Sequence, residues 1–194
     1  MVNEAEFKKA NNYSLKCMRV AFIVLVIAWI LNILHIFIVD QAIMNSALIG
    51  VTIFVTLGHA VKYAIGFEKT ASNYIMIFLL VAMISFANVE LAYHATLFMI
   101  FPMITSIVYT EKKYKSFTFA LTIGGFFLSV VGGYYWGLCD ANTLILTTTT
   151  SAKEAETLLA GTIDINTNIV NIILFFVLPR IMALVAFNAV LNYI

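Results

Sequence analysis

Six long apolar runs, separated by short polar stretches, constrain the fold of this chain more than any other feature. Of its 194 residues, 62% are hydrophobic and only 11% are charged, whereas a soluble domain carries about 25% charged residues. An apolar helix of about 20 residues crosses the hydrocarbon core of a bilayer and satisfies its own backbone hydrogen bonds. We therefore expect an all-α fold, a polytopic membrane bundle of six transmembrane helices in a single domain, residues 1–194. The expected spans are about 18–39, 41–64, 73–88, 95–109, 117–136 and 169–192.

The basic residues predict how these spans are oriented. Nine of the eleven Lys and Arg side chains fall on the same side of the expected spans as the N-terminus: Lys8, Lys9, Lys16, Arg19, Lys62, Lys69, Lys112, Lys113 and Lys115. Cytoplasmic loops are enriched in Lys and Arg, so both termini are expected in the cytoplasm of a multi-pass cell-membrane protein. Residues 1–16 are then a cytoplasmic lead, and residues 137–168 form an outer loop. A net charge of +1 indicates no nucleic-acid partner.

An aromatic corner closes the fifth apolar run and opens the outer loop. Tyr134 and Trp136 end the run, and Asp140 and Asn142 follow just after Gly137. Aromatic rings anchor a helix at the membrane–water interface, and Asp and Asn side chains bond their own turns. Two interpretations stay open: an interfacial belt, or the roof of a ligand site on the outer face.

A ligand pocket is expected in the outer half of the bundle, beneath this corner. His35 lies near the outer end of the first span, and Glu90, Tyr93 and His94 form the expected turn between the third and fourth spans. Small-molecule sites combine apolar walls with a few convergent polar groups, and these residues supply polar groups at one depth. Acidic residues outnumber basic ones on this side, which favours a cationic or hydrogen-bond-donating ligand.

The sequence carries no motif that assigns a cofactor or a reaction. It has no phosphate-binding glycine loop, no HExxH and no pairing of a nucleophile with a base, so we expect neither enzyme activity nor a cofactor. His35, His59 and His94 show no dedicated metal spacing. A metal ion, or a haem held by two histidines from different spans, stays open beside ordinary hydrogen bonding within the bundle.

The sixth apolar run contains a proline followed by a charge, Pro179 and Arg180. Proline removes one helix hydrogen bond, and a charge near the middle of a bilayer costs at least about 2.5 kcal/mol on insertion scales. The pair is therefore either structural, with Arg180 in an ion pair, bonding carbonyls or reaching the cytoplasmic side, or functional, as a signalling switch between two helix packings or as a contact to an anion.

Small residues at a spacing of four mark one face of the fifth run. Gly125, Ser129 and Gly133 lie on this face. Small side chains let membrane helices approach closely, so this face is expected to pack against another helix.

Several short runs carry a family resemblance when they are taken together. They are Leu31–Met44, Tyr93–Ala95 with Phe101, Pro102 and Tyr109, Gly133–Asn142 with Leu146 and Thr147, and Leu178–Arg180. In these runs the chain resembles the N-terminal membrane sensor region of Gram-positive bacterial signalling proteins, over about residues 20 to 190. In that group a six-span bundle precedes a cytoplasmic output domain, a GGDEF diguanylate cyclase or a histidine kinase.

The resemblance implies a sensory input module that detects a small ligand at its outer half and signals to a cytoplasmic output domain. The 194 residues contain no such output domain, so no catalytic activity is assigned to them. Two alternatives stay open: a small-solute transport component, such as a substrate-binding membrane subunit, and a structural protein without a ligand. A homodimer is compatible with each of them.

Overall fold

The computed structural model describes residues 4–36, 39–135 and 169–192, and for residues 92–94 and 171 it describes the backbone alone. Every regular element in these ranges is a helix. The elements are α1 (Glu4–Ile33), α2 (Gln41–Ala64), α3 (Thr70–Ala95), the 3₁₀ helix η1 (Thr96–Met99), α4 (Ile100–Ser106), α5 (Lys112–Tyr135), α8 (Ile169–Ile172), the π-helix η2 (Ile173–Val177) and α9 (Leu178–Leu191).

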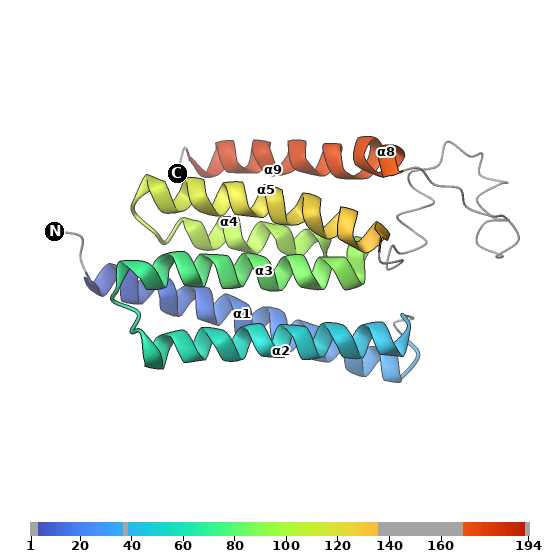
Figure 1. The fold of residues 1–194 in the computed structure, drawn as a ribbon, viewed down its shortest axis with the longest axis horizontal. Coiled ribbons are helices and arrows are strands. Elements are labelled where there is room, and N and C mark those ends of the chain that lie inside the picture. The colour runs from blue at the N-terminus through green and yellow to red at the C-terminus, as the bar shows by residue number, and fades with distance from the viewer. Residues whose placement is uncertain (1–3, 37–38, 136–168, 193–194) are drawn as a thin grey trace, which may run out of the picture.

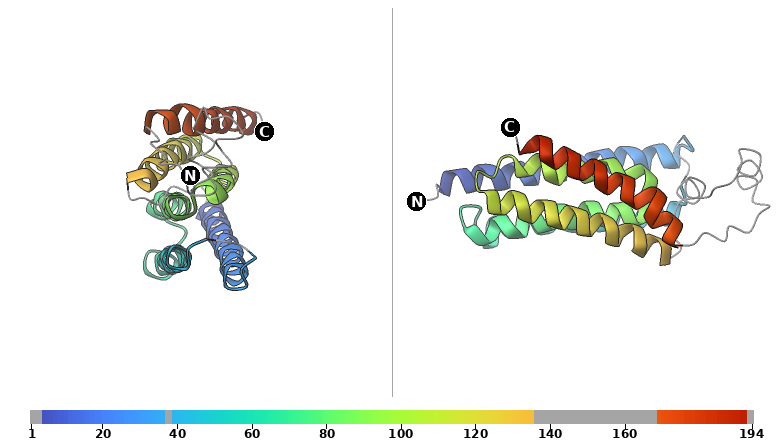
Figure 2. Two further views of the ribbon diagram at one scale, coloured as in Figure 1. Left: turned by 90° about the vertical axis from the view of Figure 1, so that its right-hand side faces the viewer. Right: turned by 90° about the horizontal axis from the view of Figure 1, so that it is seen from above.

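The helices run alongside one another in an elongated bundle (Figure 1). The start of α1 and the end of α9 lie at the same end, which we call the basal end; the end of α1 and the start of α2 lie at the opposite, distal end. Helix α3 lies in the middle and packs against α1, α2 and α5 (Figures 1 and 2). Helix α9 covers the outside of the bundle, where it contacts α4 and α5.

The composition of the helices indicates a membrane protein. Five helices are long and apolar enough to cross a bilayer: α1, α2, α3, α5, and the segment of η2 with α9. Large apolar side chains also point out of the bundle, among them Ile27 of α1 at 52% exposed and Ile49 of α2 at 62% exposed. A soluble protein rarely exposes such continuous apolar surface, so these faces are suited to contact with lipid.

The fourth expected span, 95–109, corresponds to a shorter helix than predicted. Its regular part covers only Thr96–Ser106, which at 1.5 to 2.0 Å per residue is about 20 Å long, less than a hydrocarbon core of about 30 Å. The reason lies in α3, which continues to Ala95 instead of ending near residue 88. Pro102 sits in the first turn of α4, where its missing N–H needs no partner.

Three further boundaries can be compared with those expected from the sequence. Helix α2 begins and ends where the sequence predicts, because Asp40 caps its first turn by accepting from the N–H groups of Ala42 at 2.8 Å and Ile43 at 3.3 Å. From Glu4 onward the expected lead, residues 1–16, is helical and continues into the first span as one helix, α1. The expected turn at Glu90 and Tyr93 is wrong, because the backbone stays helical through both residues.

The small-residue face of α5 packs against α3, which confirms that prediction. Ser129 is 2% exposed. A Cβ added to Gly133 would lie 3.2 Å from the backbone oxygen of Val89, and one added to Gly125 would collide with the Ser85 hydroxyl. The absence of side chains on these glycines therefore sets how closely α5 approaches α3.

Candidate functional site

Glu90 is held by a hydrogen bond between helices in the distal half of the bundle. The Ser46 hydroxyl of α2 donates to Glu90 Oε1 of α3 over 2.8 Å. Nearby on α2, Asn45 Oδ1 accepts from the Trp29 indole N–H of α1 at 2.8 Å and from the Gln41 amide at 3.0 Å. These polar contacts join α1, α2 and α3 near the distal end, at the level where sequence reasoning expects the ligand.

His35 ends α1 by adopting a left-handed backbone conformation, with φ of 56°. The His35 N–H donates to the Asn32 carbonyl at 3.0 Å, and the Ile36 N–H donates to the Leu31 carbonyl at 2.9 Å. This pair of bonds is a Schellman cap, in which the left-handed position usually holds glycine. The His35 side chain is exposed, so the role that the structure gives this residue is to stop the helix.

The other expected site residues are described only in part. Tyr134 is half-buried near the distal end of α5, with its ring edge-on to Tyr135 at a centroid distance of 5.3 Å. Tyr93 and His94 belong to the last turn of α3, and their side chains are outside the description. Trp136, Asp140 and Asn142 lie outside the described residues.

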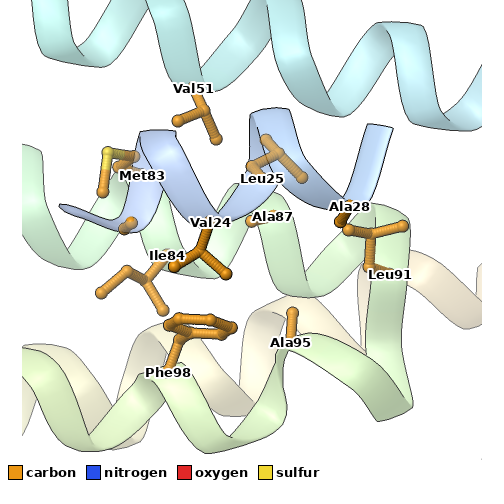
Figure 3. A pocket seen from close by; sticks show the side chains of 11 residues that line it. Val24, Leu25, Ala28, Val51, Met83, Ile84, Ala87, Leu91, Ala95 and Phe98 are labelled. Carbon is orange, nitrogen blue, oxygen red and sulfur yellow. The ribbon is translucent and has the colours of Figure 1, made fainter. Parts of the chain in front are cut away.

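A cavity of about 120 Å³ lies between α1, α2, α3 and η1 (Figure 3). Its walls include Leu25 of α1, Val51 of α2, Ile84 and Leu91 of α3, and Phe98 of η1. None of the described residues that line it has a polar side chain. The cavity therefore fits a hydrocarbon group and gives no anchor to a polar solute.

A chain of polar side chains crosses the bundle between α3, η1 and α5. Asn88 is fully buried; its amide donates to Ser129 Oγ at 2.7 Å, and its carbonyl oxygen accepts from the Thr96 hydroxyl at 3.2 Å. The Ser129 hydroxyl donates in turn to the Phe126 carbonyl at 2.8 Å. Because each group has a partner, this chain stabilises one relative position of the three elements.

Helix η2 is a π-helical turn directly before Pro179 and Arg180, the expected switch. A proline ring clashes with the carbonyl four residues earlier, here that of Phe175 inside η2, and the wider turn accommodates it. Arg180 folds back: its Nη1 donates to the Phe176 carbonyl at 3.1 Å, and its guanidinium lies 3.7 Å from the Phe176 ring centroid. Single π-turns within α-helices are frequently found at functional sites.

A second buried polar network lies at the basal end, where sequence reasoning placed no site. Asn11 of α1 donates to the Phe67 carbonyl at 2.9 Å and to Asn73 Oδ1 of α3 at 2.7 Å. The Tyr109 hydroxyl donates to Asn11 Oδ1 at 2.8 Å and lies 3.1 Å from Ser14 Oγ. Burial raises the pKa of Tyr109, which lies in the connection between α4 and α5, so the phenol stays protonated and keeps this bond.

The spacing of the N-terminal residues carries the signal that sequence reasoning missed. Phe7, Ala10, Asn11, Ser14 and Leu15 are all buried, and their spacing of three and four is that of one helix face. Among the described residues, no group of three or more His, Cys, Asp or Glu side chains is placed to hold a metal ion.

Comparison with known proteins adds no relative. No protein-family model matches the chain, and neither a curated protein nor a solved structure shows significant similarity to it.

Proposed function

We propose that the chain is a membrane-embedded sensory input module. It detects a small ligand in its distal half and passes the signal along α9 to a cytoplasmic output domain of the diguanylate cyclase or kinase type. The proposal places six passes in the cell membrane with both termini in the cytoplasm. It is supported by the basal position of both ends of the described chain and by the nine basic residues expected on that side.

The observation that carries the proposal is the π-turn at Pro179. Packed helices switch between discrete arrangements rather than deforming continuously, and a helix interrupted by a π-turn and a proline has an identifiable place to bend. Helix α9 is also the least enclosed of the long helices, since only 17% of its most apolar stretch is buried. A helix that packs loosely and bends at one point is suited to transmit a signal.

The ligand site of the proposal is the distal level around Glu90. Its described members are His35, Glu90 and Tyr134, and the proposal adds Tyr93, His94, Trp136, Asp140 and Asn142. Support comes from the Ser46–Glu90 bond, which holds a carboxylate at this level, and from the cavity in Figure 3.

A reporter fusion tests the proposal. A diguanylate cyclase domain of known activity is joined to the end of α9, and its basal product is measured in cells. Pro179→Ala removes the cause of the π-turn and is expected to change the basal output. Met182→Ala, at an exposed position one turn away on the same helix, is the matched control and should leave it unchanged. Equal output from the two variants at equal membrane levels would contradict the sensory proposal.

A small-solute transport component remains the second candidate. Such a component needs polar groups along a path for its solute. The apolar lining of the cavity in Figure 3 does not favour this function over sensing.

A further inference from the structure

We infer that α1 and α2 together form, in their basal halves, a binding site for the phosphate group of an anionic phospholipid, with the guanidinium of Arg19 at its centre. Arg19 of α1 joins His59 of α2, since its Nε and Nη2 atoms lie 3.2 Å and 3.1 Å from His59 Nε2. Arginine has only donors, so Nε2 is the acceptor and the imidazole is neutral, with its proton on Nδ1. The contact orients the guanidinium without compensating its charge.

One side of this guanidinium is left open. Its Nε–Nη2 side faces His59, whereas Nη1 has no hydrogen-bond partner among the described residues. The Arg19 side chain is exposed, so the Nη1 side of the fork can face a ligand. A guanidinium presents a planar fork of N–H groups that matches the oxygen atoms of a phosphate.

Two lysines extend the positive charge toward the basal end. Lys16 precedes Arg19 by three residues and Lys62 follows His59 by three, a spacing that places helical neighbours on one face. Because α1 and α2 run in opposite directions (Figure 1), both lysines lie about 4.5 Å to the basal side of the contact between Arg19 and His59. All three cations are exposed, and none forms an ion pair with a described acidic side chain. This charge favours an anion as the ligand.

The contact lies at the depth of lipid head groups. Helix α2 rises about 27 Å from Gln41 to His59, close to the hydrocarbon thickness of about 30 Å. A membrane boundary at the distal start of α2 therefore puts the opposite boundary near His59. Tyr63, one turn further, is 82% exposed, as is typical of tyrosines at the interface. Basic pockets between membrane helices on the cytoplasmic side, where the proposed topology puts this level, bind anionic head groups.

The surface distal to Arg19 favours a lipid over a free phosphate ion. Ile23 and Ile27 follow Arg19 at successive intervals of four residues, so they continue the same face of α1 into the apolar level. Their side chains are 55% and 52% exposed. The acyl chains of a lipid whose phosphate is bound at Arg19 can cover these two isoleucines, whereas a soluble anion leaves them uncovered.

Native mass spectrometry of the full chain, purified in detergent and stripped of lipid, tests the site. Dioleoylphosphatidylglycerol is the probe; dioleoylphosphatidylcholine, which has the same phosphate and acyl chains but no net charge, is its match. The first anionic lipid should bind about five-fold or more tightly than its match. Arg19→Gln keeps a donor for His59 but loses the charge, so it should remove this preference. Lys112→Gln, at an exposed lysine of α5, should keep it. Equal binding of the anionic lipid by the wild type and Arg19→Gln would overturn the inference.

A pair of double variants keeps the test decisive if Arg19→Gln does not fold. Lys16→Gln with Lys62→Gln leaves Arg19 and its contact in place. It should weaken binding of the anionic lipid about five-fold or more, since each basic side chain near a head group contributes. Lys9→Gln with Lys112→Gln removes the same charge at exposed positions outside the site and should not weaken it. Equal weakening by the two double variants would show that general charge attracts the lipid and would overturn the inference.

Competition with inorganic phosphate separates a lipid from a free ion as the ligand. Incubation with excess phosphate before buffer exchange should not release the anionic lipid, because phosphate cannot cover Ile23 and Ile27. Release of the lipid would overturn its assignment to this site. The binding is measured on the purified chain without an output domain, so its failure is distinguishable from failure of the sensory role.

Discussion

In this apolar bundle, a few polar side chains select one arrangement of the helices. Apolar packing between helices in lipid has little directional preference, so hydrogen bonds that must be satisfied select one arrangement. Asn88 fulfils this role between α3, η1 and α5, and Asn11 fulfils it between α1, α3 and the connection after α4. Arg180 differs from both, because its charge lies on a helix at the outside of the bundle.

Tyr109→Phe is expected to destabilise the basal network. The change removes the donor to Asn11 Oδ1 and the neighbour of Ser14 Oγ, and a buried acceptor left without its donor costs about 1–3 kcal/mol. The measurement is thermal unfolding in detergent. Tyr63→Phe, at a tyrosine that is 82% exposed, is the control and should not shift the midpoint. If both variants unfold at the wild-type temperature, the network contributes nothing to stability.

His35→Gly separates the structural role of this residue from a role in binding. Glycine adopts the left-handed conformation without strain, whereas a β-branched residue does not. We expect His35→Gly to keep or raise the unfolding temperature and His35→Val to lower it. A midpoint for His35→Val at or above that of His35→Gly would show that the cap geometry does not matter. Loss of reporter output in His35→Gly at full stability would instead assign the imidazole to the ligand site.

At the scale of elements, the contact between α3 and α5 should be the least tolerant of added volume. Gly133→Leu must displace the backbone around Val89, which cannot move as a flexible side chain can. Gly124→Leu is the matched control, since nothing lies within 4 Å of its added Cβ. The first variant should lower the unfolding temperature clearly, and the second should leave it unchanged or raise it, because leucine favours helix over glycine. If Gly124→Leu lowered the unfolding temperature more than Gly133→Leu, the close approach of α5 to α3 would not lie at Gly133.

The sequence predicted correctly those features that depend on residues close together in the chain. Helix α2 follows from Asp40, and the packed face of α5 follows from its small residues. Helix α3 runs past its expected end, and Glu90, one of the residues that suggested a turn, is bonded across helices: it accepts from Ser46, a residue 44 positions away. A partner so distant along the chain cannot be identified from the local sequence pattern.

The candidate site can be compared with the sequence in the same way. The level of the site and its polar residues are predictions from spacing along the spans, and they stay predictions. The cavity in Figure 3 could not, because its walls come from four elements and contain only common apolar side chains. The sequence did not predict a π-turn, although Pro179 indicated where the last helix would be irregular.

At the scale of the whole molecule, the orientation in the membrane can be tested with the two native cysteines. Cys17 belongs to the basal half of α1, and Cys139 belongs to the expected outer loop. A membrane-impermeant maleimide added to intact cells should label Cys139 and not Cys17. Labelling of both after the cells are opened is the control for reactivity. Preferential labelling of Cys17 in intact cells would invert the proposed topology.

The central claim, that α9 moves against the bundle about its π-turn, is tested most directly by a distance distribution. Spin labels at Lys113→Cys on α5 and Val190→Cys on α9, both exposed positions toward the basal end, report this motion in nanodiscs once Cys17 and Cys139 are replaced by serine. The account predicts two distance populations in the otherwise unaltered chain and one in Pro179→Ala, with Met182→Ala retaining both. A single distribution, identical in all three proteins, would contradict it.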